Sequence, residues 1–204
     1  YEEIPAWIMQ GYGTMAMEAD QQFSEAAKEA PSHVFVQAGV GSLAGAVVGY
    51  FANRYPENPP TFVVVESDQA DCLYKSACAG DGGIRIVDGD MQTIMVGLAC
   101  GEPNTISWDI LKNHVKVFIA APDWVAATGM RMLGAPIKGD APVTSGESGA
   151  APFGALAAVM SMDEYADLRK DIGLDENSRV LLFSTEGDTD PDRYKNIVWK
   201  GLDK

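Results

Sequence analysis

Residues 37–45, with the sequence QAGVGSLAG, have the residue types and spacing of an anion-binding turn. They join an apolar run to a stretch of helical character, and glycines in such a turn let an anion approach the peptide N–H groups closely. The start of the following helix supplies unpaired N–H groups and a partial positive charge. A phosphate is the natural guest, and the Ser42 hydroxyl adds a donor. The alternative is a tight turn whose glycines only satisfy packing.

The same turn also fits a second ligand class. Gly39-x-Gly41-x-x-Ala44 meets the short dinucleotide fingerprint, and Glu66 ends the next apolar run, roughly where a carboxylate for a ribose would lie. A non-catalytic dinucleotide-binding module therefore stays open as an alternative to a phosphate-bearing cofactor.

Two further segments carry polar side chains that could do chemistry. Ser184 and Thr185 follow the last apolar run, and the acidic turn at 186–190 comes directly after them. A cation site and a turn in which Asp residues bond to their own backbone explain these acids equally well. Glu147 begins a predicted helix, where its carboxylate could cap the positive end or contact a site.

The elements that must position these residues follow from short apolar, β-branched runs that alternate with helical stretches. Strands that are apolar throughout and separated by helices indicate a parallel sheet covered on both faces. The predicted fold class is α/β, a doubly wound, mostly parallel sheet. Strands are expected at 33–38, 61–65, 84–87, 115–121 and 179–183, and helices at 42–54, 71–79, 91–99, 108–113, 123–133, 149–160 and 162–172. Ligands should bind at the carboxyl ends of the strands.

The composition of the chain restricts the classes of partner that it can bind. The chain has 204 residues and a formal net charge of −14, which argues against a nucleic acid or an anionic membrane as the main partner. No apolar stretch reaches the roughly 18 residues needed to cross a bilayer. Cys72, Cys78 and Cys100 have no metal-ligand spacing, so we expect no metal site and reduced thiols in the cytoplasm. Because the chain opens on Tyr1 rather than Met, we expect a fragment or a processed product.

Several segments together resemble the pyridoxal-phosphate enzymes of the tryptophan synthase β / threonine dehydratase fold type. Residues 10–14 with Glu18 resemble the start of a helix in that family, and residues 39–43 are similar to its phosphate loop. Residues 147–150 resemble the entry to its buried helix, and residues 184–188 its terminal turn. Longer blocks at 4–12, 97–103, 145–150 and 184–190 resemble the 2,3-diaminopropionate ammonia-lyases within it, and the resemblance runs the whole length of the chain.

The resemblance implies a function and a set of cofactor contacts. It implies β-elimination of 2,3-diaminopropionate to pyruvate and ammonia by a homodimer that binds pyridoxal 5'-phosphate. It also implies that Thr185 puts a neutral hydroxyl at the ring nitrogen, which leaves that nitrogen largely unprotonated, with Ser184 as the alternative for this contact. The implied cofactor-binding residues are Gly39, Val40, Gly41, Ser42 and Leu43, which donate main-chain N–H groups to the phosphate, together with Thr185, Ser184 and Glu147.

One part of the family pattern has no counterpart. The Schiff-base lysine and the acidic proton acceptors of the family lie in its N-terminal half, and no lysine of this chain sits in a matching motif. The resemblance therefore implies that residues 1–204 are the C-terminal part of the enzyme, mainly its large cofactor-binding domain, with no catalytic residue and no activity alone. A threonine or serine dehydratase-like lyase is the alternative within the family, and a folded but inert half-protein is a further one.

Overall fold

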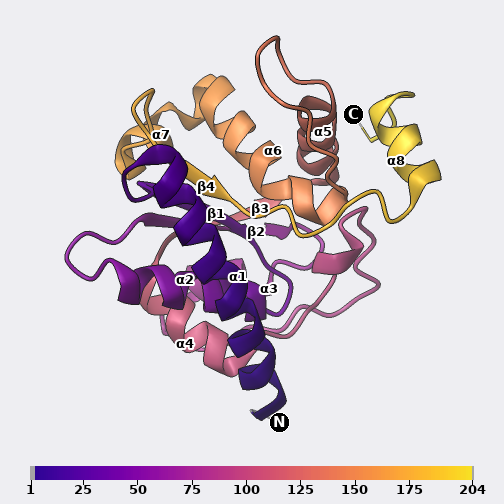
Figure 1. Cartoon of the computed structure of the whole chain (residues 1–204). Helices are drawn as coiled ribbons and strands as arrows, with labels where there is room; N and C mark the ends of the chain where they lie inside the picture. The colour runs from indigo at the N-terminus through magenta and orange to yellow at the C-terminus, as the bar shows by residue number, and fades with distance from the viewer. Residues whose placement is uncertain (1–2, 204) are drawn as a thin grey trace.

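Four of the apolar runs form a central sheet in the computed structural model, which describes residues 3–203 (Figure 1). All of its strand pairs are parallel, and the order is β3-β2-β1-β4. The strands are β1 (His33–Gln37), β2 (Thr61–Ser67), β3 (Val115–Ala121) and β4 (Val180–Leu182). Every residue of β1 is buried, which explains why the run is apolar throughout rather than alternating.

Helices cover both faces of this sheet, as Figure 1 shows. On one face Phe35 and Val63 pack against α5 and α6, and on the other Val34 and Val64 pack against α2 and α4. This arrangement confirms the doubly wound α/β fold. The first face carries α5 (Asp123–Gly134), α6 (Glu147–Ser161) and α7 (Ala166–Ile172), with α8 (Pro191–Val198) packed on α5; the second carries α1 (Glu3–Ala27), α2 (Ser42–Arg54), α3 (Cys72–Ala79) and α4 (Thr105–His114).

Two predicted elements between α3 and α4 are wrong. Residues 84–87 form no strand, and of the helix expected at 91–99 only a 3₁₀ turn at Val96–Leu98 is present. The backbone there is held by scattered bonds instead of a ladder: Arg85 N donates to Ser76 Oγ at 2.8 Å and Val87 N to Gly101 O at 2.8 Å. Gly82 and Gly89, on either side of residues 84–87, have positive φ, which also interrupts regular structure.

The N-terminal motif is also placed differently from its prediction. Residues 10–14 lie inside α1, which begins at Glu3, and not at the start of a helix. Gly11 and Gly13 have open space around them, so the helix tolerates them without a packing role. Neither α1 nor α8 was predicted as a helix. Tyr1, on which the expectation of a fragment rested, lies outside the described residues.

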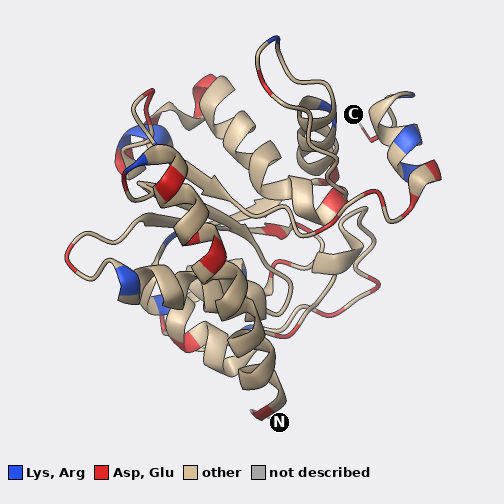
Figure 2. Ribbon diagram, viewed as in Figure 1, with Lys and Arg blue, Asp and Glu red and all other residues tan. Residues whose placement is uncertain are grey.

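Charge is distributed over the whole molecule rather than gathered on one face. Figure 2 shows acidic residues on helices of both layers and on the loop that leads from β4 to α8. Among residues 3–203, no helix combines the length and the hydropathy that a membrane span requires.

Candidate cofactor site

A cavity of about 340 Å³ lies at the carboxyl ends of β1 and β4, beside the start of α2. Its size falls in the range of about 300–1,000 Å³ typical of small-molecule sites. The sheet positions it as expected, because ligands of doubly wound folds bind where strands end. Residues 37–43 form one wall, and the lining also includes Tyr12, Cys100, Ser148, Thr185 and Glu186.

The glycine turn makes one side of this cavity. Gly41 precedes α2 with φ of 97°, a left-handed conformation that favours glycine, and the helix starts without a side-chain cap. A Cβ at Gly39 would meet Cys100 Sγ at 3.3 Å, so the turn has little room for a side chain. The first-turn N–H groups of α2 therefore remain available to an anion.

Asn104 holds this turn in place, although it was not among the predicted site residues. Its backbone N–H donates to Val40 O at 2.7 Å, and its side-chain Oδ1 accepts from Ile106 N at 3.0 Å as the cap of α4. Its Nδ2 donates to Ser42 Oγ at 3.0 Å, so the Ser42 proton is left to donate elsewhere. The sequence signal was an Asn directly before a helix, the N-cap pattern.

Thr185 is brought to the same cavity by a second buried amide. Gln37, only 2% exposed, donates through Nε2 to Phe183 O at 3.0 Å and to Thr185 Oγ1 at 3.0 Å. Its Oε1 is buried and has no hydrogen-bond partner within residues 3–203. Gln37 was not predicted as a site residue, because in the sequence it is only the last residue of an apolar strand.

Glu186 occupies the second helix start at this cavity. Its Oε2 accepts from Ser148 N at 2.7 Å and from Gly149 N at 3.3 Å, at the beginning of α6. A carboxylate satisfies the unpaired N–H groups there and favours the positive end of the helix. Of the two helix starts that contribute to the lining, the one at α6 is filled and the one at α2 is open to a ligand.

Asp190 of the turn at 186–190 bonds to the backbone of the helix that follows it. Asp190 accepts from Arg193 N at 3.0 Å and caps α8. Over the described part of the chain, no three His, Cys, Asp or Glu side chains come together in a way that could hold a metal ion. The interpretation of Asp190 as a residue that bonds to its own local backbone is therefore confirmed.

Two predicted site residues do not line the cavity. Ser184 Oγ bonds to Ser145 Oγ at 2.8 Å, and a Glu147 carboxylate oxygen lies 3.2 Å from Arg193 Nε of α8. Burial raises the pKa of Glu147, with the nearby Glu186 charge acting in the same direction. The structure thus groups Thr185 with Gly39, Val40, Gly41, Ser42 and Leu43, and places Ser184 and Glu147 in neighbouring contacts instead.

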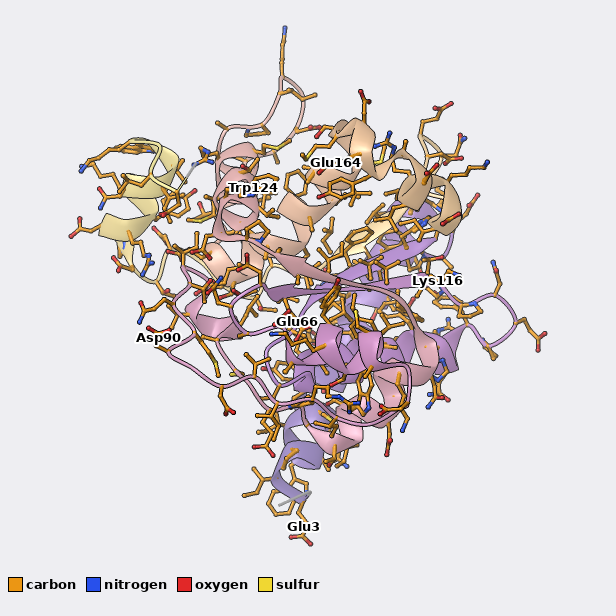
Figure 3. The ribbon with its side chains drawn as sticks, turned by 180° about the vertical axis from the view of Figure 1, so that it is seen from behind. Glu3, Glu66, Asp90, Lys116, Trp124 and Glu164 are labelled. Carbon is orange, nitrogen blue, oxygen red and sulfur yellow. The ribbon has the colours of Figure 1, made fainter. Side chains whose placement is uncertain are left out.

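Glu66 is not available to a ribose. Both of its oxygens are occupied by the start of α3, because it accepts from Leu73 N at 2.9 Å and from Tyr74 N at 2.7 Å. It is fully buried, and burial raises the pKa of this carboxyl to about 8 against the two N–H bonds that lower it. Figure 3 shows Glu66 in the interior, whereas Asp90 lies on an outer loop. The dinucleotide interpretation needs this carboxylate for the ribose, but its oxygens are already bonded to α3.

Comparison with known proteins agrees with a phosphate-bearing cofactor. The family model described as "pyridoxal-phosphate dependent enzyme" matches residues 4–186. The chain is 54% identical over 202 residues to the diaminopropionate ammonia-lyase of Salmonella typhimurium, covering 98% of this chain and 50% of that relative.

Solved structures give the same picture. The selenomethionine-labelled holo diaminopropionate ammonia-lyase of Escherichia coli superposes with a TM-score of 0.91 at 46% identity, over 100% of this chain and 50% of that one. Its complex with an aminoacrylate–PLP azomethine reaction intermediate superposes with a TM-score of 0.89 at 46% identity, over 100% and 51%. The chain spans about half the length of these relatives. It belongs to the family of pyridoxal-phosphate dependent enzymes.

Proposed function

We propose that this chain supplies the cofactor-binding part of an ammonia-lyase that converts 2,3-diaminopropionate and water into pyruvate and two molecules of ammonia. The support comes from the relatives named diaminopropionate ammonia-lyase and from the cavity at the start of α2. The finer choice of substrate rests on those relatives, of whose length this chain spans about half.

The observation that carries the proposal is the convergence of an open helix start and a hydroxyl on one cavity. The glycine turn at the uncapped start of α2 offers N–H groups of the kind that a phosphate accepts from, and Thr185 offers a hydroxyl within the same lining. Gln37 also lines the cavity, and its buried Oε1 is an acceptor without a partner among residues 3–203. These residues fit pyridoxal phosphate.

Each residue then has a defined task. The main-chain N–H groups of residues 39–43 and the Ser42 hydroxyl would bind the phosphate, and Thr185 would hold the ring nitrogen. Glu186 occupies the start of α6, so the start of α2 is the one that stays open to the phosphate. The cofactor, when bound, supplies an electron sink for negative charge at the substrate Cα.

Proton transfer and covalent attachment of the cofactor are proposed to come from outside this chain. None of the residues that line the cavity in the described structure is a lysine. We therefore propose that residues 1–204 form mainly the large cofactor-binding domain and are inactive by themselves.

The test uses the chain co-expressed with the complementary half of the Salmonella relative, the half with which it does not align; we call this pair the reconstituted enzyme. We expect the visible absorbance of a bound cofactor and release of pyruvate and ammonia from 2,3-diaminopropionate. A folded pair without a visible chromophore would contradict the proposal. Release of 2-oxobutyrate from threonine at a higher rate would instead favour a dehydratase.

Assembly and location are proposals of the same kind. We infer a homodimer in the cytoplasm that acts in amino-acid catabolism. The dimer is supported by large apolar side chains exposed on α1, including Trp7 at 63%, because such a surface favours contact with other protein. The location is supported by Cys72, Cys78 and Cys100, which are free thiols. Sedimentation of the reconstituted enzyme tests the dimer, which is contradicted if only one copy of each half is found.

A further inference from the structure

Tyr12 brings a phenol from α1 to the cavity. It lines the cavity together with residues 39–43 and is half-buried. Within residues 3–203 its hydroxyl has no hydrogen-bond partner. Two tyrosines of α2 and its C-terminal end differ in this respect, because the hydroxyls of Tyr50 and Tyr55 both donate to Asp20 of α1. Of these three phenols, the one at the cavity is free to bond to a ligand.

The contact between Asp20 and α2 places Tyr12 along that helix. Asp20 Oδ2 accepts from Tyr50 Oη at 3.2 Å. Tyr12 precedes Asp20 by eight residues (20 − 12), and Ser42 precedes Tyr50 by eight residues (50 − 42). Because both helices rise by about 1.5 Å per residue, two helices that run side by side in the same direction bring Tyr12 level with Ser42.

A second contact shows that α1 and α2 do run in the same direction. Met9, one turn before Tyr12, has its Sδ 3.6 Å from Asn104 Nδ2. The same nitrogen donates to Ser42 Oγ at 3.0 Å, at the first residue of α2. The early part of α1 thus lies beside the start of α2, and its later part beside the end of α2. Tyr12 therefore lies at the end of the cavity where the glycine turn offers its N–H groups.

This end of the cavity has no cationic side chain for a phosphate. No Lys, Arg or His lines the cavity in the described part of the chain, and the carboxylate of Glu186 is already bonded to the start of α6. A phosphate here depends on N–H and O–H donors of neutral groups. A phenol is more acidic than an aliphatic hydroxyl and is therefore a stronger donor to an oxyanion.

We infer that Tyr12 is a phosphate-binding residue, whose phenol donates a hydrogen bond to the cofactor phosphate beside the N–H groups of the glycine turn. The inference rests on the proposed function and adds a donor from α1, outside the glycine turn. A deprotonated phosphate oxygen can only accept, so the phenol is the donor in this bond. The helix α1 thus forms part of the phosphate pocket as well as covering α2.

The test removes the hydroxyl of Tyr12 and the phosphate of the ligand separately. The reconstituted enzyme, freed of cofactor, is titrated with pyridoxal phosphate and with pyridoxal, which lacks the phosphate. In Tyr12→Phe we expect the dissociation constant of pyridoxal phosphate to rise about ten- to hundredfold, the scale of one hydrogen bond to a charged group. The dissociation constant of pyridoxal should change by less than about twofold, because the lost partner is absent from this ligand.

Tyr50→Phe is the matched control, because it removes a phenol hydroxyl from the same helix pair at a position that does not line the cavity. It should leave the affinity for both ligands unchanged. An equal loss of affinity for the two ligands in Tyr12→Phe overturns the inference, since it shows a contact to the ring or a displaced helix. No loss for either ligand overturns it too, as does a Tyr50→Phe variant with the losses expected of Tyr12→Phe.

A second substitution keeps the test decisive where Tyr12→Phe does not fold. 3-Fluorotyrosine in place of Tyr12 keeps the hydroxyl and makes it a stronger donor. At about pH 6.5, where a phenol stays protonated, pyridoxal phosphate should bind about two- to threefold more tightly and pyridoxal with unchanged affinity. Unchanged or weaker binding of pyridoxal phosphate overturns the inference alone. An unsubstituted reconstituted enzyme that binds pyridoxal phosphate no more tightly than pyridoxal overturns the proposed function as well.

Discussion

At the scale of single residues, the site depends on side chains whose partners are main-chain groups. Gln37 is fixed by Phe183 O, Asn104 by the start of α4, and Glu186 by the start of α6. A main-chain partner cannot rotate or change its role, so each of these side chains presents its remaining atoms in one way. The orientation of the polar groups in the cavity is thus set partly by residues that do not contact the ligand.

Gly41 gives the sharpest test of the proposal that the glycine turn before α2 binds a phosphate. Its φ of 97° is strained for any L-residue, and a Cβ there would meet Leu111 Cδ1 and Ser107 Cβ at 3.3 Å. We expect Gly41→Ala to destabilise the chain by about 1–3 kcal/mol and to weaken cofactor binding by the reconstituted enzyme at least about tenfold. Urea unfolding and cofactor titration measure the two effects. Gly11→Ala, in open space on α1, should instead stabilise by about 0.5–1 kcal/mol; equal losses in both variants would refute this account.

Glu66 predicts a pH dependence of stability. Its pKa is raised from about 4.3 in an unfolded chain to about 8 in the fold, so the folded state binds more protons between these values. Its contribution to stability is therefore complete below about pH 4.3 and is lost as pH rises toward 8, with a slope of at most about 1.4 kcal/mol per pH unit.

The variant Glu66→Gln should flatten this slope, because the amide carries no charge to bury. Urea unfolding between pH 5 and 8 measures it. Glu29→Gln serves as the matched control, since Glu29 lies in an exposed ion pair with Arg179 and should leave the slope unchanged. A slope in Glu66→Gln identical to that of the unsubstituted chain would count against the burial argument.

At the scale of elements, the cavity depends on how closely α5 and α6 approach one another. A Cβ at Gly154 of α6 would lie 2.0 Å from Val125 O of α5, and one at Gly129 of α5 would lie 2.4 Å from Ala150 O. Reciprocal glycines therefore let the two backbones touch. This contact sets the position of α6, whose Ser148 lines the site.

We expect Gly154→Ala to cost about 3 kcal/mol, because backbone rather than a flexible side chain must move. The control Gly49→Ala adds a Cβ inside α2 at an ordinary 3.6 Å from Ile110, and should stabilise by about 0.5–1 kcal/mol through helix propensity. The denaturant midpoints of the two variants show whether the loss comes from the close α5–α6 contact or from alanine at any helical glycine. Midpoint shifts of the same sign in both variants would exclude the α5–α6 contact as the cause.

At the scale of the whole molecule, the cavity gathers segments that are far apart along the chain. Residues 37–43, 97–100, 148 and 185–186 meet only once the sheet has formed with β4 beside β1. A ligand in the cavity bridges these segments and so stabilises the fold as a whole.

We therefore expect pyridoxal phosphate to raise the melting temperature of the chain. At a concentration one hundred times its dissociation constant the stabilisation is about 2.7 kcal/mol, which corresponds to a shift of about 5–10 °C for a domain of this size. NAD at the same concentration should produce no shift, because Glu66 is engaged by α3. Calorimetry measures both, and protection by NAD alone would revive the dinucleotide interpretation.

The sequence by itself determined the layered fold, the glycine turn before α2 and the resemblance to the family. Continuous β-branched runs such as residues 61–65 favour strands buried on both faces, and a glycine turn before a helix is a local pattern that needs no tertiary information. These features are encoded in neighbouring residues. The resemblance in blocks such as residues 97–103 added the cofactor, which the comparisons then supported.

Only the tertiary structure decided which polar side chains share the cavity. Gln37 and Thr185 are 148 residues apart, and Asn104 and Ser42 are 62 apart, so no local pattern pairs them. The same reason explains why Glu147 and Ser184 were expected at the site and lie beside it, since their partners Arg193 and Ser145 are chosen by packing. Local order follows from near neighbours along the chain, whereas the partner of a buried polar group is set by the strand order and by the helices that pack on it.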